Sequence, residues 1–323
     1  MKIFTVLVLF IFLHSESVSQ SLLNALHSPI LFQGDETTAY RDPAVLFYEQ
    51  VFYLFFTVVE IEDDGKVFSY TATSQSSDLQ NWTKPEKITP RDQSLNYSSP
   101  GNVIRFKDEW ILCLQTYPRP DHYNTLPVRY GNQDARIFLM RSRDLIHWDK
   151  PEIMMVKGNE VPADQMGRMI DPYLLGDKDE TGRYWCFYKQ KGVSLSWSHD
   201  LKNWNFHSFT DAGENVCVLT ENDEYILFHS PTNGIGILKS SNLKDWQPWG
   251  DLITLGQTNW VWARGRITAG TVVNLKHVSG IGHYLMFFHG SGPLKETEGD
   301  FDKNASIGIA WSKDLIHWHW PGN

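Results

Sequence analysis

Three acidic residues stand at the start of separate apolar runs, and this spacing can bring their side chains together. Asp42 and Asp171 are each followed by proline and hydrophobic residues, and Glu214 precedes the apolar run 216–219. Carboxylates that share one site repel one another, so their pKa values diverge and acid and base roles can be divided between them. An isolated Asp-Pro is often only a turn former. The chemistry therefore depends on whether all three residues occupy the same structural position.

The spacing within the runs favours such an equivalence. The interval from Asp42 to Tyr53 equals the interval from Glu214 to Tyr225, without a gap. We therefore align Glu214 with Asp42, and Asp171 joins them through its Asp-Pro dipeptide. All three are expected at the beginning of equivalent strands.

A repeated turn sequence supplies the elements that would position these carboxylates. Serine, any residue, Asp or Asn, Leu and, three residues after the Leu, Trp recur five times, at 76–82, 142–148, 198–204, 240–246 and 312–318. The Ser and Asp or Asn favour a turn that hydrogen-bonds its own backbone, while the Leu and Trp pin it to a core. Two strand-like runs precede each copy, and a third leads into it. The sequence therefore predicts an all-β fold, a five-bladed β-propeller with four-stranded antiparallel blades.

The two ends of the chain indicate how the ring closes. The first four units continue past their Trp into a fourth strand, but the fifth stops at residues 321–323. Residues 28–34 resemble the fourth-strand segment 150–156. We expect this N-terminal strand to join the last blade, which removes an exposed sheet edge. Residues 20–323 would then form a single propeller domain.

A propeller would bring the three carboxylates together in one polar funnel, because the first strand of every blade starts on the same face. Second strands return to that face, and their ends, together with residues beside the acidic positions, are predicted to bind substrate: Gln115, His229, His289, Arg41, Arg168, Arg264 and Arg266. Trp262 is a candidate sugar-stacking residue, with packing beneath its loop as the alternative. Loops 117–130 and 293–300 should shape the pocket.

The N-terminal segment and the composition predict an exported protein. Lys2, the apolar stretch 3–13 and the small-residue neighbourhood 14–20 are typical of a signal peptide, here residues 1–19. The apolar stretch is too short to span a bilayer, so we expect a secreted or periplasmic protein that is free of the membrane after cleavage. A net charge of −9 disfavours nucleic acid as a partner. Three cysteines rule out a disulfide framework, and buried thiols are expected.

The pattern resembles the five-bladed glycoside hydrolases of family 43 and their relatives, which share a trio of Asp, Asp and Glu. Asp42-Pro43, Asp171-Pro172 and Glu214 carry this likeness over almost the whole mature chain. It implies that Asp42 is the general base, that Asp171 tunes pKa values and positions substrate, and that Glu214 is the general acid. Family members often have Gly-Pro after the acid, where this chain has Asn215 and Val216.

The same resemblance sets expectations for the reaction. It implies an inverting, exo-acting glycosidase, with two reacting carboxyl groups roughly 6.5–9.5 Å apart. The partner would be an oligosaccharide or polysaccharide, with arabinofuranosides, xylosides and galactosides all open as substrates. No cofactor and no catalytic metal are expected, although some relatives hold a structural calcium ion.

Two other functions remain open from the sequence. A related five-bladed group comprises glycoside phosphorylases, which use phosphate as the nucleophile and need a cluster of Arg and His in the funnel. Such a cluster could be formed by Arg264, Arg266, His229 and His289. The other function is a non-catalytic glycan-binding propeller, which has no need for three mutually repelling carboxylates.

Overall fold

The computed structural model describes residues 22–125, 127 and 130–322. The predicted signal peptide, residues 1–19, lies outside the described residues and stays a prediction. Within the described part the chain is built of β-strands and a few 3₁₀ turns: η1 (Leu22–Ala25), η2 (Ala163–Gln165), η3 (Val261–Ala263) and η4 (Glu296–Glu298). No helix in these ranges is long and apolar enough to cross a membrane.

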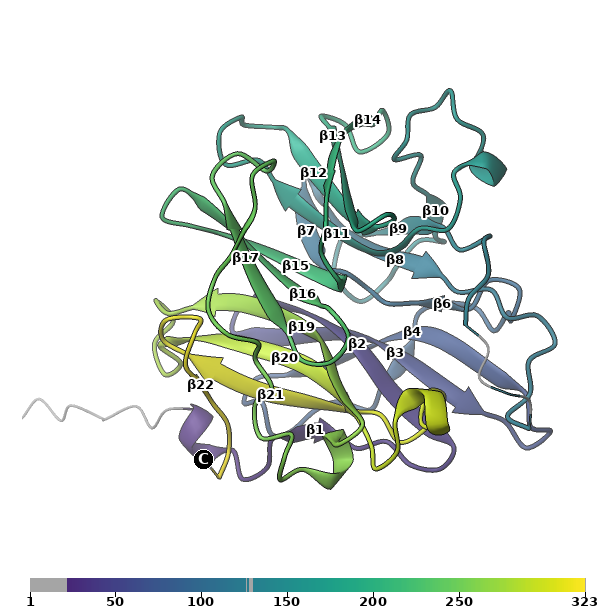
Figure 1. Ribbon diagram of the computed structural model, residues 1–323, viewed down its shortest axis with the longest axis vertical. Coiled ribbons are helices and arrows are strands. Elements are labelled where there is room, and N and C mark those ends of the chain that lie inside the picture. Colours follow the sequence, from purple (N-terminus) through teal and green to yellow (C-terminus); the bar gives the residue numbers. More distant parts are fainter. Residues whose placement is uncertain (1–21, 126, 128–129, 323) are drawn as a thin grey trace, which may run out of the picture.

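Five antiparallel sheets surround a common centre in chain order, which confirms the predicted five-bladed propeller (Figure 1). The first strand of each blade is innermost and contacts the first strands of both neighbouring blades. Blade 1 holds β2 (Thr38–Tyr48), β3 (Val51–Ile61), β4 (Val67–Ser76) and β5 (Glu86–Lys87). Blade 2 holds β6 (Tyr97–Ser98) and β7 (Val103–Phe106), which together form its inner edge, then β8 (Glu109–Thr116), β9 (Ile137–Ser142) and β10 (Glu152–Ile153).

The remaining three blades repeat this order. Blade 3 holds β11 (Ile170–Gly176), β12 (Tyr184–Lys189), β13 (Val193–Ser198) and β14 (Asn205–Thr210). Blade 4 holds β15 (Glu214–Glu221), β16 (Glu224–Ser230), β17 (Gly236–Ser240) and β18 (Gln247–Pro248). Blade 5 holds β19 (Arg266–Leu275), β20 (His283–Ser291) and β21 (Ser306–Ser312), with β1 (Ile30–Phe32) and β22 (Trp318–His319) both paired to β21.

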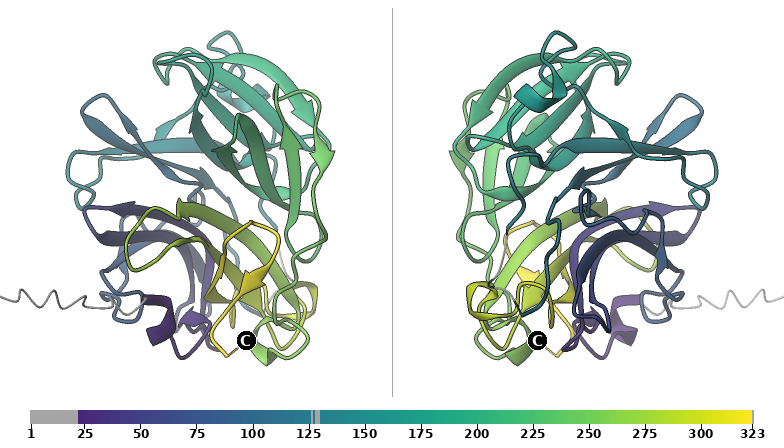
Figure 2. Two further views of the ribbon diagram at one scale, coloured as in Figure 1. Left: turned by 90° about the vertical axis from the view of Figure 1, so that its left-hand side faces the viewer. Right: turned by 90° about the vertical axis from the view of Figure 1, so that its right-hand side faces the viewer.

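The N-terminal strand closes the ring as predicted. β1 runs antiparallel to β21, with Ile30 opposite Gly308 and Phe32 opposite Ile307. The first and the last strand of the chain therefore both belong to the last blade (Figure 2). The expectation that unit five lacks a fourth strand was incomplete, because the two-residue β22 also pairs with β21, at Trp311 and Ser312.

The repeated turn follows each third strand and fastens it to the core. In the first copy, Ser76 Oγ accepts the Leu79 N–H and Asp78 Oδ1 accepts the N–H groups of residues 80 and 81. The Trp82 indole N–H donates to the Leu79 carbonyl at 3.0 Å, and the same Trp-to-Leu bond recurs in the other four copies. The Leu takes a positive φ in all five copies, and its side chain is buried. The local hydrogen bonds offset the conformational energy cost of the left-handed Leu. The turn thus fixes the end of the third strand against the core of each blade.

The three cysteines lie in the apolar cores and are free, as expected. Burial raises the pKa of Cys113 to about 12 and that of Cys217 to about 11, so both stay protonated at neutral pH. They act as small apolar side chains.

Candidate active site

The inner edge of each blade has a kink at an equivalent position along the strand. The candidate catalytic residues lie at or beside these kinks. The register with the second strand shifts between Arg41 and Ala44 in β2, and equivalent shifts occur in β11, β15 and β19. At each kink one residue has a left-handed backbone: Asp42 (φ 49°), Asp171 (φ 53°), Asn215 (φ 52°) and Ala269 (φ 54°), with Ser99 (φ 41°) between β6 and β7 of blade 2. Such a bulge re-aims the side chains beside it toward the propeller axis.

This register corrects one alignment made from the sequence. Arg41 pairs with Thr57 in blade 1, and Glu214 pairs with Ser230 in blade 4, across hairpins of equal length. Glu214 is therefore equivalent to Arg41, and Asn215 occupies the position of Asp42. The equal Tyr53 and Tyr225 intervals misled the alignment because Tyr53 faces Leu46 whereas Tyr225 faces Thr220, one step out of phase. Glu214 still reaches the cavity, because both residues of the bulge line it.

The left-handed backbone of residue 215 also explains how this chain can carry asparagine after Glu214, where the resembled family often has glycine. Glycine adopts a positive φ without steric cost, and asparagine is among the few other residues that tolerate it. Asn215 thus keeps the backbone conformation that a glycine would provide.

The main-chain N–H of the kink residue is held by a side chain from the preceding blade. At four of the five blade junctions, the acceptor lies on the second strand: His289 Nδ1 for Asp42 (3.0 Å), Thr57 Oγ1 for Ser99 (2.7 Å), Gln115 Oε1 for Asp171 (2.6 Å) and Ser230 Oγ for Ala269 (2.9 Å). At the junction of blades 3 and 4 the equivalent residue is Lys189, whose ammonium has no acceptor. There the Asn215 N–H donates to Asp171 Oδ2 at 3.2 Å.

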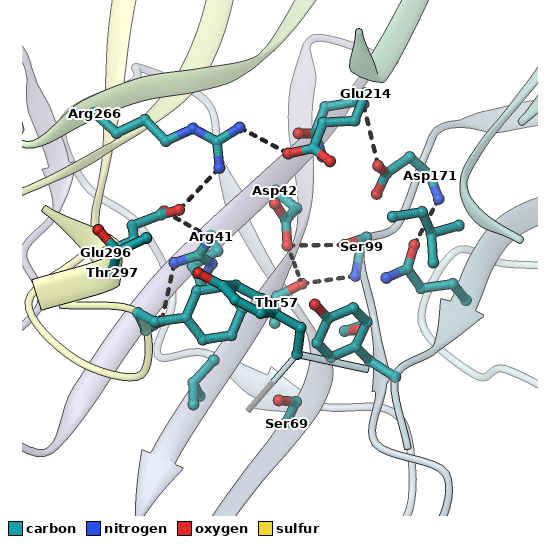
Figure 3. Close-up of a pocket in the computed structure, with 18 of the residues that line it drawn as sticks. Arg41, Asp42, Thr57, Ser69, Ser99, Asp171, Glu214, Arg266, Glu296 and Thr297 are labelled. Carbon is teal, nitrogen blue, oxygen red and sulfur yellow. Dashed lines mark hydrogen bonds and ion pairs between the residues drawn. The ribbon is translucent and has the colours of Figure 1, made fainter. Parts of the chain in front are cut away.

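A cavity of about 720 Å³ opens on this face of the ring, and the three predicted carboxylates all line it. The predicted substrate-binding residues that also line it are Arg41, Gln115, Arg168, Arg264 and Arg266. Figure 3 shows Asp42, Asp171 and Glu214 approaching one another from three separate strands. The structure therefore brings the trio into one site.

Asp42 is held firmly at the bottom of the cavity. Its Oδ2 accepts hydrogen bonds from the hydroxyls of Thr57 and Ser99, both at 2.9 Å. Its Oδ1 lies 3.5 Å from Nδ1 of His289, and the side chain is only 12% exposed. The two hydroxyl donors therefore fix the orientation of the Asp42 carboxyl group in the cavity.

Asp171 is the most buried of the three carboxyl groups, with the residue 6% exposed. Burial, followed by the negative charges of Glu214 and Asp42, raises the pKa of Asp171 to about 8. The Asp171 carboxyl consequently carries a proton at neutral pH. Removing that charge lowers the repulsion within the trio.

Glu214 belongs to an alternating chain of charges that crosses the cavity wall (Figure 3). Arg266 donates to Glu214 Oε1 at 2.7 Å and to Glu296 Oε2 at 2.8 Å. Glu296 Oε1 in turn lies 2.8 Å from Nη2 of Arg41. Burial opposes ionisation of Glu296, but Arg41, His289 and Arg266 together hold its pKa well below the usual range. The Glu214 side chain is 33% exposed, so it is the member of the trio most open to a ligand.

Comparison with known proteins adds to this geometry. No protein-family model matches the chain, and no curated protein matches it. Among solved structures, a thermostable family-43 glycoside hydrolase matches with a TM-score of 0.59 at 14% identity, over 90% of this chain and 95% of its own. An exo-1,5-α-L-arabinanase from a bovine ruminal metagenomic library matches with a TM-score of 0.56 at 15% identity, over 87% of this chain and 95% of its own.

A third match is a GH43 β-xylosidase/α-arabinofuranosidase from a compost microbial metagenome, solved with xylotriose in a calcium-free form. It has a TM-score of 0.58 and 13% identity, over 92% of this chain and 98% of its own. The fold is that of the family-43 glycoside hydrolases. This agrees with the resemblance that the Asp, Asp and Glu positions indicated.

Three of the predicted substrate-binding residues lie outside the lining of the cavity within this fold. His289 is buried behind Asp42, with its Nε2 3.6 Å from Glu296. His229 accepts the Gly213 N–H at 2.9 Å, and burial, then the charge of Lys189, lowers its pKa to about 4. Both histidines thus hold backbone or carboxylate groups rather than facing the cavity.

Trp262 is the third of these residues, and it packs beneath its loop. Its ring stacks on Trp260 at 5.2 Å and on Phe288 at 5.9 Å between ring centroids. The missing side chains of Gly290 and Gly308 make room for it, since a Cβ at either position would lie within 2.8 Å of the Trp262 ring. Close aromatic packing of this kind is the alternative that the sequence left open.

The aromatic wall of the cavity comes instead from the loops that were predicted to shape the pocket and from their flank. Tyr117, Tyr130 and Phe301 line the cavity, and Phe301 contacts both tyrosines at centroid distances of 6.3 and 5.0 Å. Arg119, also on the lining, was missed because it is buried and paired with Asp302, at 2.6 Å. The only hint in the sequence that these residues line the cavity was the aromatic and basic composition of the predicted loop 117–130.

No group of three or more His, Cys, Asp or Glu side chains in the described part of the chain is arranged to hold a metal ion. A structural calcium ion therefore stays an expectation from the resemblance.

Proposed function

We propose that the protein is a glycoside hydrolase that cleaves a glycosidic bond in an oligosaccharide or polysaccharide with inversion of configuration. The observation that carries this proposal is the convergence of Asp42, Asp171 and Glu214 from three blades into one cavity. Two carboxyl groups, one that activates water and one that protonates the leaving oxygen, are the minimum that inversion requires.

The surroundings of each carboxyl group support a particular role. Asp42 is the general base, since its two hydroxyl donors and fixed backbone hold its carboxyl group in one orientation in the cavity. Glu214 is the general acid, since it is the most exposed of the three and can reach a leaving group. Asp171 positions substrate and tunes its neighbours from its buried place.

Glu214 is paired with Arg266 in the structure, whereas a general acid has to face the leaving oxygen of the substrate. Arg266 has a second partner in Glu296, which keeps the guanidinium bound when Glu214 turns to the leaving oxygen. We therefore propose that substrate binding separates Glu214 from Arg266 and leaves the Arg266–Glu296 pair intact.

The cavity supports exo action on a terminal sugar. Its volume of about 720 Å³ lies within the range of small-ligand pockets, and loops carrying Tyr117, Tyr130 and Thr297 contribute to its walls. We also propose that the mature protein is secreted or periplasmic, which rests on the sequence of residues 1–19.

The decisive experiment is a screen of aryl and natural glycosides, with and without inorganic phosphate, alongside Asp42→Asn and Glu214→Gln. Hydrolysis should proceed without phosphate and fall by about 100-fold or more in each variant. The anomeric form released, followed by NMR, should be inverted. Turnover only with phosphate would replace the proposal by a phosphorylase, and binding without turnover would leave a glycan-binding protein.

A further inference from the structure

Cationic side chains outnumber carboxyl groups on the cavity lining, although the protein is acidic. Six cationic side chains line it, Arg41, Arg119, Arg168, Arg264, Arg266 and Lys295, against the four carboxyl groups of Asp42, Asp171, Glu214 and Glu296. The whole chain has a net charge of −9. A concave site attracts anionic ligands where its cationic side chains lack carboxylate partners.

Four of the six cations already have carboxylate partners. Arg41 and Arg266 share Glu296, and Arg266 also binds Glu214. Arg119 pairs with Asp302 at 2.6 Å, and Lys295 lies 3.7 Å from Glu298. Among the described residues, no carboxylate lies within 4.0 Å of the guanidinium of Arg168 or of Arg264. Two arginines therefore face the cavity without an ion pair.

Arg168 is the better placed of these two arginines. It is half-buried, and its guanidinium carbon lies 5.9 Å from the centre of the Tyr117 ring. The charge of Arg168 acts on the Asp171 carboxyl, yet that group is protonated at neutral pH and cannot neutralise it. The Arg168 carbonyl accepts a hydrogen bond from Gln190 at 3.0 Å, which anchors the backbone. The Arg168 side chain hydrogen-bonds the Tyr117 hydroxyl, a neutral partner that leaves the guanidinium charge unpaired.

We propose that the sugar bound in this cavity carries a carboxylate, as a uronic acid does, and that Arg168 binds this group with Arg264 as a second cation. This inference rests on the proposed function, in that it takes the cavity to be a carbohydrate site. Arginine presents paired N–H donors that match a carboxylate, and a partly buried position strengthens such a pair. A neutral sugar would leave the Arg168 donors without an ionic partner.

Inorganic phosphate has the same oxyanion chemistry and is the competing source of the anion. If the arginines bind a uronate, the sugar itself must be anionic. If they bind phosphate, the anion is the nucleophile and the sugar can be neutral. A test therefore needs acidic sugars, matched neutral sugars and phosphate as separate arms.

The experiment measures binding of uronate-containing oligosaccharides and of their carboxyl-reduced forms to the full chain by titration calorimetry. The acidic form should bind roughly 10-fold or more tightly than the reduced form, and Arg168→Gln should remove most of that difference. Arg264→Gln should remove a smaller part. Arg143→Gln is the matched control, because Arg143 is exposed on the turn of blade 2, outside this cavity, and should change neither affinity.

The outcomes separate this inference from the proposed hydrolase. Hydrolysis of neutral glycosides with no preference for acidic ones would overturn the uronate inference and keep the hydrolase. Tight binding of acidic oligosaccharides that depends on Arg168, but without cleavage by the wild type, would support the inference and refute the hydrolase. Turnover that requires phosphate, with Arg168→Gln raising the phosphate concentration needed, would assign the arginine to phosphate and overturn the inference.

Discussion

Gln115 Oε1 accepts the main-chain N–H of Asp171 at 2.6 Å, across the junction between blades 2 and 3. Gln115 is the penultimate residue of the second strand of its blade, and Asp171 lies at the kink of the next inner strand. The same junction bond joins His289 to Asp42 and Ser230 to Ala269. The propeller thus aims two of its three carboxylates by side chains that belong to the preceding blades.

Substituting Gln115 should impair catalysis through Asp171. In Gln115→Leu the buried Asp171 N–H loses its acceptor, which should cost about 1–3 kcal/mol of stability and lower kcat about 10-fold through a misplaced carboxyl group. Urea denaturation gives the first value, and kinetics well below the unfolding temperature give the second. Ser230→Ala is the matched control, because it removes the acceptor of the non-acidic Ala269. Equal losses of kcat in the two variants would refute a positioning role for Gln115.

The protonated state of Asp171 should appear in the pH dependence of stability. Its pKa rises from about 3.8 in the unfolded chain to about 8 in the folded protein, so the folded state binds more protons between these values. The contribution of Asp171 to stability is therefore fully present below pH 4 and is lost as pH rises toward 8, by up to about 1.4 kcal/mol per pH unit.

Asp171→Asn removes this titration and keeps an acceptor for the Asn215 N–H. The variant should therefore gain stability relative to the wild type as pH rises from 5 to 8, and thermal unfolding at several pH values measures the difference. A difference that stays constant over this range would mean that Asp171 is ionised in the folded protein.

The kink in blade 4 makes a further prediction about backbone strain. Asn215 has φ 52°, a backbone conformation that glycine adopts without steric strain and a β-branched residue does not. Asn215→Gly should leave stability within about 1 kcal/mol, whereas Asn215→Val should destabilise by about 1–2 kcal/mol or more, as judged by urea midpoints. Equal effects of the two changes would show that backbone conformation is not what selects asparagine here.

The five blades and their closure were predictable because they depend on local signals. Each repeated turn bonds its own backbone, and β1 resembles the outer strand of another blade, so neither needs long-range knowledge. The convergence of Asp42, Asp171 and Glu214 followed from the same periodicity. The one-residue error at Glu214 arose because the alignment treated Tyr53 and Tyr225 as equivalent, whereas they lie one residue apart in the strand register.

The cavity walls were less predictable, because loop partners are set by tertiary contacts. Glu296 is remote in sequence from Arg41 and Glu214, yet Arg266 and Glu296 link them into one charged chain. The assignment of Trp262 to substrate binding relied on residue type, whereas its location depends on two distant glycines that leave space for its ring.

The contrast between Trp262 and Tyr130 can be tested directly. Trp262 stacks within the packed aromatic group, so Trp262→Ala should cost about 3 kcal/mol of stability through a cavity and lost contacts. Tyr130 lines the cavity and is 48% exposed, so Tyr130→Ala should change stability by less than about 1 kcal/mol. The loss of an exposed aromatic face from the cavity wall should instead raise KM for an oligosaccharide several-fold. Chemical denaturation and initial-rate kinetics on both variants separate the two effects. If Trp262→Ala kept its stability and raised KM while Tyr130→Ala did neither, the sugar would stack on the tryptophan, and the cavity wall would have to be reassigned.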